Sequence, residues 1–427
     1  MRVYLTFLGC RVNESEIESL GRDFLRAGHR LVTDPAQADL VVVNTCTVTG
    51  EAGRKSRRLI RRLHRINPRA DLAVTGCHVE AAWEEVAVLP GVRWLVGNAD
   101  KERLVEIVAP PAAPMDREPL LRDWRPGRWG HTRAFVKVQD GCDNRCTFCV
   151  TTLVRGTGRS RPLADVVREV QALVEAGYRE VVLTGIHLGS YGHDWGDRQG
   201  LRHLVEALLT DTDLLRLRLS SLEPWDLDEA FFRLWESPRL CPHLHLPLQS
   251  GCDATLRRMA RRTTTARYRR LVEAARSAIP DLALTTDIIV GFPGETEEAF
   301  RRSYDFVAEI GFAKLHVFPY SPRPGTAAAR MADQVPPAVK VARGRAMRHL
   351  GERMARAFRE RFLGRTLPVL WEGAVEPSEP GEGGRRWEGL TPNYLRVVAV
   401  HPDDLHNAIT STRLVALQNG HLVGEVA

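Results

Sequence analysis

The sequence predicts an α/β protein in three parts: an N-terminal open parallel sheet, a central partial (β/α) barrel of six units and a small C-terminal all-β domain. Two series of alternating strand-like and helix-like segments predict the first two parts, and short alternating runs near the end predict the third. We place the domains at 1–110, 131–363 and 364–427. A proline-rich linker at 111–130, which lacks either hydrophobic period, separates the first two.

Composition narrows the class of protein. The chain has 427 residues, of which 44% are hydrophobic and 26% charged, as in ordinary folded proteins. It contains no apolar run of membrane-spanning length and begins without a signal-peptide pattern, so we expect a cytoplasmic protein without membrane attachment. A net charge of +7 favours a polyanionic partner. Eight cysteines in such a chain favour metal or redox chemistry over disulfides.

The N-terminal part repeats one pattern three times. Apolar runs at 2–10, 38–46 and 71–77 each end in a cysteine, and helical segments at 15–28 and 53–66 separate them. Asn13 is expected to cap the first helix, with Glu16 three residues on. Parallel strands present their carboxyl ends at one edge, so Cys10, Cys46 and Cys77 are predicted to form a three-thiolate set. Each of these cysteines taken alone is equally typical of a small buried apolar residue.

The central part alternates strands and helices. Strands are predicted at 134–139, 180–186, 216–223, 243–249, 284–292 and 314–321, with helices such as 163–177 and 296–311 between them. Barrel folds of this kind build their active sites at the strand carboxyl ends. Glycine-rich and polar segments collect at these ends, which indicates an enzyme.

The C-terminal part alternates apolar and polar residues at 365–375, 385–400 and 410–426, interrupted by Gly, Pro and Asn. This pattern predicts a small β-barrel that binds oligonucleotides, or else a passive cap.

The segment "GCDNRCTFC" places Cys142, Cys146 and Cys149 in one loop after the first barrel strand. Three thiolates can hold a four-iron cubane and leave one iron free to bind another molecule. A zinc site completed by a remote histidine, Cys241 or Cys252 is the alternative from spacing alone. The position of the loop, followed by five more strands with glycine-rich ends, favours the cluster.

A basic helix gives a separate indication of RNA. At 100° per residue, Arg54, Arg58, Arg61 and Arg65 share one face, while Leu59, Ile60, Leu63 and Ile66 share the opposite one. No acidic residue lies between Arg54 and Arg69, whereas a merely solvated face usually carries both signs of charge. Three further arginines follow the cysteine loop and are expected to contact a phosphate backbone: Arg155, Arg159 and Arg161.

These motifs together resemble the methylthiotransferase branch of the radical S-adenosylmethionine enzymes. The resemblance rests on "FLGCRVNESE", "NTCTVTGEAGRKSRR", "VTGCHVE", "QDGCDNRCTFC", "RGTGRSRP", "LTGIHLGSYG", "LPLQSGCD", "TDIIVGFPGET" and "FPYSPRPGT", and it covers the chain from end to end. Within the branch, "GCRVN" and "CTVT" followed by "RKSRR" look most like the tRNA N6-threonylcarbamoyladenosine (t6A) methylthiotransferases.

The resemblance implies two [4Fe–4S] clusters and two molecules of S-adenosylmethionine per turnover. Cys142, Cys146 and Cys149 would hold the cluster that cleaves S-adenosylmethionine to a 5′-deoxyadenosyl radical. Cys10, Cys46 and Cys77 would hold an auxiliary cluster that carries the inserted sulfur, and Cys241 and Cys252 would be structural. Residues implied to contact S-adenosylmethionine are Phe148, Gly185, Glu223, Gln249, Val290 and Tyr320.

The implied substrate is tRNA, modified in the anticodon stem-loop at C2 of t6A, with an external reductant such as flavodoxin or ferredoxin. No feature indicates the sulfur donor. Two alternatives keep the chemistry and change the acceptor, to isopentenyladenosine in tRNA or to a ribosomal protein. An alternative of another class is a non-catalytic iron–sulfur protein that binds RNA or transfers electrons.

Overall fold

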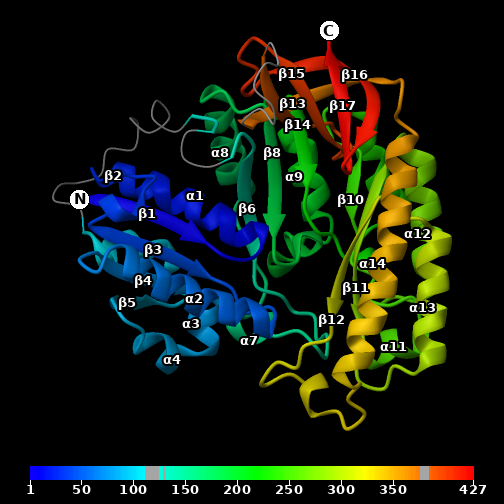
Figure 1. Ribbon diagram of the computed structural model, residues 1–427, viewed down its shortest axis with the longest axis horizontal. Coiled ribbons are helices and arrows are strands. Elements are labelled where there is room, and N and C mark those ends of the chain that lie inside the picture. Colours follow the sequence, from blue (N-terminus) through cyan, green and yellow to red (C-terminus); the bar gives the residue numbers. More distant parts are fainter. Residues whose placement is uncertain (111–124, 128–130, 376–383) are drawn as a thin grey trace.

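The computed structural model describes residues 1–110, 125–127, 131–375 and 384–427, arranged around three sheet systems (Figure 1). Most of the predicted linker at 111–130 lies outside the described residues. Within those ranges, no helix combines the length and the apolar character that crossing a membrane requires.

The N-terminal part is a five-stranded parallel sheet in the order β2-β1-β3-β4-β5, as predicted. Helix α1 packs on one face, and α2 and α3 pack on the other, so that the central strands are buried on both sides. The strands are β1 (Arg2–Phe7), β2 (Arg30–Leu31), β3 (Leu40–Thr45), β4 (Asp71–Gly76) and β5 (Val92–Val96). The helices are α1 (Arg11–Arg26), α2 (Gly50–Ile66), α3 (Cys77–Ala81), α4 (Trp83–Ala87) and α5 (Leu104–Val108).

The prediction that Asn13 caps α1 is wrong. The helix begins at Arg11 with Cys10 in the cap position, and Asn13 lies within the first turn. Its buried amide donates to the carbonyls of Leu8 and Thr45, at 2.7 and 3.1 Å. Asn13 therefore joins the ends of β1 and β3 behind the first cysteine, instead of satisfying a free helix N–H.

The central part contains the six predicted strands in sequential spatial order. Parallel pairing runs from β6 through β8 to β9 and from β10 through β11 to β12, and isolated bridges such as Ser221–His245 join the two groups. Their bounds are β6 (Ala134–Asp140), β8 (Glu180–Gly185), β9 (Arg216–Leu219), β10 (His243–His245), β11 (Ala283–Val290) and β12 (Lys314–Pro319), with β7 (Arg159–Ser160) antiparallel to β6. The helices include α7 (Thr151–Arg155), α8 (Leu163–Glu175), α9 (Gly200–Asp211), α10 (Glu229–Phe232), α11 (Asp253–Arg258), α12 (Thr265–Ala278) and α13 (Glu297–Ile310).

Helix α1 covers the open edge of β6, where the barrel would otherwise expose unpaired backbone groups. The Ser15 hydroxyl donates to the Phe135 carbonyl at 2.8 Å and accepts the Lys137 N–H at 2.9 Å. The Glu18 carboxylate accepts the Phe135 N–H at 3.3 Å. Because the side chains of α1 take the place of a neighbouring strand, the N-terminal sheet is fixed beside the first barrel strand.

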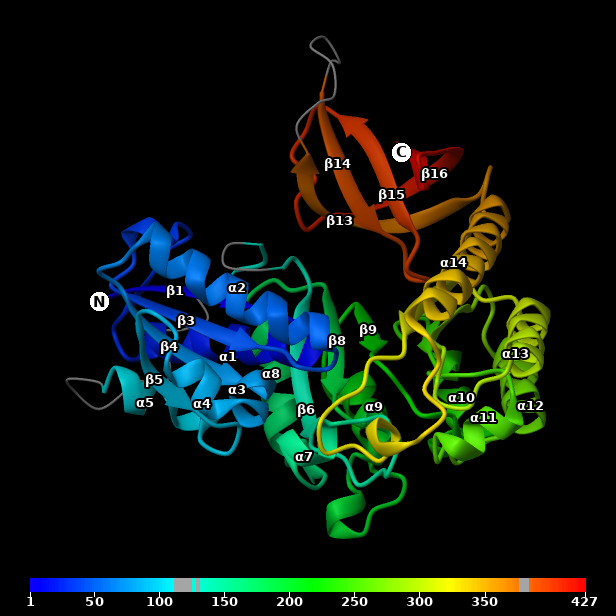
Figure 2. The same ribbon diagram turned by 60° about the horizontal axis from the view of Figure 1, so that its bottom comes forward.

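The chain leaves the barrel through α14 (Pro337–Glu360), which packs along β12 and leads into a closed five-stranded barrel, as predicted for the C-terminal part. Buried Arg216 and Arg218 of β9 donate to carbonyls of this barrel and its loop, including those of Pro368 and Pro392. The C-terminal barrel thus docks at the amino ends of the central strands, opposite the cysteine loop (Figures 1 and 2). Its strands are β13 (Thr366–Val375), β14 (Arg385–Leu390), β15 (Arg396–His401), β16 (Ile409–Gln418) and β17 (His421–Val426).

Candidate active site

The first cysteine set lies in the loop that follows β6. Gly141 begins this loop with a φ of +72°, and a Cβ placed there would lie 1.8 Å from the Thr157 carbonyl oxygen. Only glycine fits such a close approach at a left-handed φ. The turn lets the Cys142 N–H bond the Gly156 carbonyl at 3.0 Å, which folds the loop back on itself.

Donors approach the sulfurs of this set. The Arg261 guanidinium donates to the Cys146 sulfur at 3.6 Å, and the Thr151 backbone N–H donates to the Cys149 sulfur at 3.4 Å. Burial raises the pKa of the Cys146 thiol to about 11, and Arg261 opposes that rise. Metal ligation requires thiolates, so a metal or cluster bound here would release protons. Arg261 is a cation that could compensate the thiolate charge.

The second set lies at the carboxyl ends of β1, β3 and β4, where the sequence predicted it. Cys10 and Cys77 each follow a glycine with positive φ, and a Cβ on Gly9 would lie 2.8 Å from the Cys46 sulfur. Burial raises the pKa of Cys46 to about 11, and the neighbouring Cys10 and Cys77 thiols add to the rise. The three thiols therefore share one electrostatic environment.

The two sets lie on adjoining elements, because α3, which begins at Cys77, packs against α7, which follows Cys149. Cys77 packs with Val150 and Val154, which directly follow the first set, in one small apolar cluster. The Asn98 amide donates to the Val154 carbonyl at 2.7 Å and ties α7 to the N-terminal sheet. Residues separated by about 70 positions in sequence thus form one site.

Within the described ranges, no three His, Cys, Asp or Glu side chains converge closely enough to ligate a single metal ion. Cys241 and Cys252 are buried away from both sets: Cys241 lies beside Arg216 and Arg218 at the base of β9, and Cys252 begins α11. The thiols that the zinc alternative needs as a fourth ligand are therefore not positioned for that role.

Comparison with known proteins gives the family. A model of the radical SAM superfamily matches residues 136–307, and one described as uncharacterized protein family UPF0004 matches residues 2–97. A threonylcarbamoyladenosine tRNA methylthiotransferase MtaB from Bacillus subtilis is 38% identical, with 96% of this chain and 92% of the relative covered. A tRNA-2-methylthio-N(6)-dimethylallyladenosine synthase from Chloroflexus aurantiacus is 37% identical, with 99% and 91% covered. The chain belongs to the radical S-adenosylmethionine methylthiotransferase family.

Solved structures agree at the level of the fold. The radical S-adenosylmethionine methyltransferase TsrM from Kitasatospora setae aligns with a TM-score of 0.56 at 18% identity, covering 75% of each chain. The cobalamin-dependent enzyme OxsB aligns with a TM-score of 0.51 at 11% identity, covering 84% of this chain and 56% of the other. Radical S-adenosylmethionine methylthiotransferases are transferases that use S-adenosylmethionine and [4Fe–4S] clusters. A buried guanidinium donates to one sulfur of each cysteine set, Arg261 to Cys146 and Arg155 to Cys77, and such donors are compatible with an anionic iron–sulfur cluster.

Four of the six residues expected to contact S-adenosylmethionine are described by their side-chain surroundings. Phe148 and Tyr320 both pack against Phe292, with ring centroids 6.4 and 5.3 Å away, and form an apolar wall beside the first set. Glu223 is bound to Arg261, so its carboxylate is already paired. The Val290 side chain is buried in the hydrophobic core at the end of β11.

The other two expected residues shape the backbone at the strand ends. Gln249 has a φ of +72°, and its backbone N–H and carbonyl bond Asp287 and Ile289 of β11. Gly185 ends β8, where a Cβ would lie 3.1 Å from the Gln139 side chain. The close approach to Gln139 gives a structural reason for glycine at 185, whereas the left-handed φ does not explain a glutamine at 249.

A polar cavity of about 470 Å³ lies beside the loop and was not predicted from the sequence. It is lined in part by Asn144, His187, Trp225 and Asp226. His187 contacts Asp226 at 2.5 Å and Asn144 at 3.3 Å. Burial alone would lower the pKa of His187, but Asp226 and the Cys142 sulfur outweigh it and raise the pKa to about 10. The motifs "TGIHLGSYG" and "EPWD" were the available signals for this cavity.

The arginine face of α2 is exposed as predicted. Arg54, Arg58, Arg61 and Arg65 are all exposed and line one shallow groove, while Ile60 and Leu63 are buried against the sheet. Ile66, expected on the buried face, is 41% exposed because it is the last residue of the helix.

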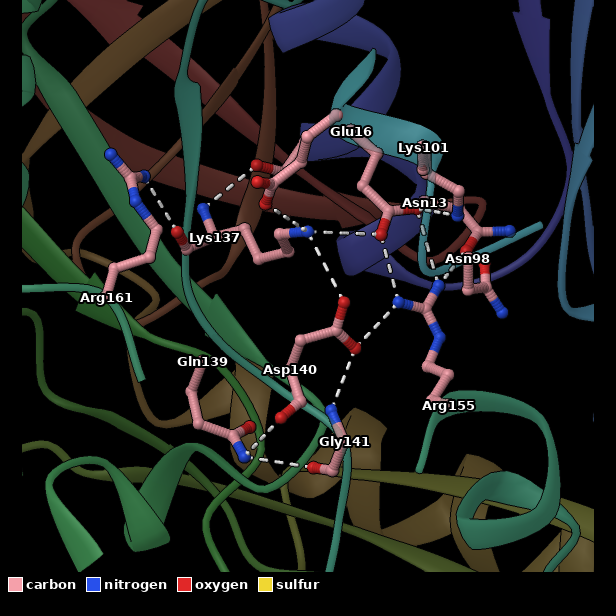
Figure 3. Close-up of polar contacts among 12 residues, drawn as sticks. Asn13, Glu16, Asn98, Lys101, Lys137, Gln139, Asp140, Gly141, Arg155 and Arg161 are labelled. Carbon is pink, nitrogen blue, oxygen red and sulfur yellow. Dashed lines mark hydrogen bonds and ion pairs between the residues drawn. The ribbon is translucent and has the colours of Figure 1, made fainter. Parts of the chain in front are cut away.

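The three arginines that follow the cysteine loop differ in burial and in their partners. Arg155 is buried and bound to carboxylates and to Cys77, so the expectation that it contacts RNA is wrong (Figure 3). Arg161 is half-buried and held by the Lys137 carbonyl and Glu169. Arg159 is exposed and available to a polyanion.

Proposed function

We propose that this protein is a tRNA methylthiotransferase that acts at C2 of t6A next to the anticodon and works in the cytoplasm. The observation that carries the proposal is the placement of two cysteine sets on adjoining elements, Cys142, Cys146 and Cys149 on one side and Cys10, Cys46 and Cys77 on the other, in a chain similar along most of its length to MtaB proteins. The t6A substrate rests on these relatives and on the "GCRVN" segment.

In this assignment each cysteine set holds one [4Fe–4S] cluster. When bound, the clusters and S-adenosylmethionine supply the radical chemistry and the transferred sulfur and methyl group. The apolar cluster of Cys77, Val150 and Val154 would hold the second set beside the segment that follows the first. The ion pair with Glu223 holds in place the Arg261 guanidinium that donates to the Cys146 sulfur. The apolar wall of Phe148 and Tyr320 borders the same loop.

The arginine face of α2 is assigned to the RNA backbone. We expect Arg58→Glu, Arg61→Glu and Arg65→Glu together to weaken tRNA binding strongly. The slope of log affinity against log salt should fall by about 0.7 for each lost phosphate contact, because each contact releases counterions. Electrophoretic mobility or fluorescence anisotropy at several salt concentrations measures both quantities.

A matched control reverses three exposed arginines on the far helices α12 and α13: Arg267, Arg270 and Arg301. This control changes net charge by the same amount and should alter the slope far less. Equal losses in the two triple variants would show that α2 has no specific role in RNA binding.

The substrate is tested by nucleoside mass spectrometry of tRNA from a strain lacking the gene. We expect 2-methylthio-t6A to disappear and t6A to accumulate, and the gene to restore the modified nucleoside. A second candidate substrate is isopentenyladenosine, because a relative of 37% identity is named for the dimethylallyladenosine product. Loss of the methylthio form of that nucleoside, with t6A derivatives unchanged, would replace the first proposal with the second.

A further inference from the structure

Arg155 lies inside the protein between the two cysteine sets. Its side chain is 1% exposed, and its Nε–H donates to the Cys77 sulfur at 3.2 Å. One terminal nitrogen donates to the Asn13 amide oxygen at 2.8 Å (Figure 3). A guanidinium presents its five N–H donors in one rigid plane, so these two contacts already fix its orientation toward the sulfur.

The other contacts of Arg155 reach the loop of the first cysteine set. Its second terminal nitrogen donates to Glu16 and to Asp140, each at 2.9 Å. The same Asp140 oxygen accepts the N–H of Gly141, the residue before Cys142, at 2.8 Å. Figure 3 shows these bonds as one continuous path. Arg155 therefore connects a ligand of one set with the backbone beside a ligand of the other.

Two lysines join Arg155 around the same two carboxylates. Lys101 contacts Glu16 at 2.7 Å, and Lys137 contacts Glu16 at 3.4 Å and Asp140 at 3.3 Å. Three cations thus surround two buried carboxylates, and the exposed Glu102 lies 4.0 Å from Lys137 at the periphery. Among these cations, Arg155 is the one that donates to a cysteine sulfur in the described residues.

We propose that Arg155 is a positioning residue of the auxiliary centre, which raises the reduction potential of the cluster on Cys10, Cys46 and Cys77 through its N–H···S bond and its charge. The inference rests on the cluster assignment made under the proposed function. Reduction adds negative charge to a cluster, and hydrogen bonds to sulfur and nearby positive charge stabilise that added charge. The contacts with Asp140 and Asn13 hold the guanidinium in place while it acts.

The test uses the full chain with Cys142, Cys146 and Cys149 replaced by alanine, so that the auxiliary cluster alone remains. Its potential is measured anaerobically by a redox titration followed by electron paramagnetic resonance. We expect Arg155→Gln to shift the equilibrium roughly tenfold toward the oxidised cluster, which is about 59 mV more negative for a one-electron couple. Arg218→Gln is the matched control, because Arg218 is also buried in an ion pair, with Glu180 at 2.7 Å, but lies at the opposite end of the strands.

Different results would overturn the role of Arg155 and the cluster assignment on which it rests. An unshifted potential in Arg155→Gln, or an equal shift in Arg218→Gln, overturns the role of Arg155 and leaves the proposed function standing. Failure of the parent triple variant to hold any cluster overturns the cluster assignment, and the inference with it.

If Arg155→Gln does not retain a cluster, Arg155→Lys is measured in its place. Lysine keeps the charge but lacks the rigid Nε donor, so we expect a smaller shift in the same direction. Pulsed electron paramagnetic resonance of protein labelled with ¹⁵N-arginine should show a nitrogen coupling that Arg155→Lys lacks. The same coupling in both proteins would contradict the N–H···S bond.

Discussion

Replacing Cys142, Cys146 and Cys149 with alanine is expected to reduce the formation of 5′-deoxyadenosine to the level of a no-enzyme control. In the proposed assignment, the cluster on this loop would bind S-adenosylmethionine for reductive cleavage, and no other described cysteines are placed to substitute for the set. Replacing Cys10, Cys46 and Cys77 should leave that cleavage active and stop sulfur insertion into tRNA. Chromatography of the nucleoside products, with dithionite as reductant, measures both reactions.

The matched control replaces Cys241 and Cys252, which are buried, as Cys46 and Cys77 are, but belong to neither set. This double variant should retain cleavage and sulfur insertion. Loss of cleavage in both triple variants would mean that the two sites depend on each other structurally, and the separate roles proposed for them would be wrong.

Gly141→Ala is expected to remove the first cluster while leaving the second in place. The left-handed φ of +72° costs a non-glycine residue about 1–2 kcal/mol. The larger effect is steric, because a Cβ 1.8 Å from the Thr157 carbonyl forces the chain entering the cysteine loop to move. Iron content after anaerobic reconstitution should fall by about four per chain, with loss of S-adenosylmethionine cleavage.

Gly177→Ala is the matched control for this substitution. Gly177 has a φ of +96°, but nothing lies within 4 Å of the Cβ position, so the backbone cost arises without the clash. We expect a modest decrease in thermal stability, of about 1 kcal/mol, and unchanged iron. If Gly141→Ala also keeps its iron and its cleavage activity, the loop does not need the observed close approach.

The strand and helix series could be predicted because apolar periodicity and glycine positions are local signals. The second cysteine set could be predicted for the same reason, since parallel strands must bring Cys10, Cys46 and Cys77 to one edge. Local signals also explain the arginine face of α2, whose apolar stripe at Ile60 and Leu63 requires the opposite side to face solvent.

The burial of Arg155 could not be predicted from such local signals. In sequence it stands beside Arg159 and Arg161 and resembles a member of a basic surface, yet it is 1% exposed. Its burial depends on Glu16, Asp140 and Cys77, which come from separate parts of the chain. The prediction that Asn13 caps α1 was wrong for a related reason. Its partners are carbonyls at the ends of β1 and β3, and a capping pattern contains no information about them.

The most direct test of two cluster sites is the amount of iron and sulfide per chain after anaerobic reconstitution. We expect about eight irons in the unaltered protein and about four in each triple cysteine variant. About four irons in the unaltered protein, with one triple variant unchanged and the other empty, would contradict it.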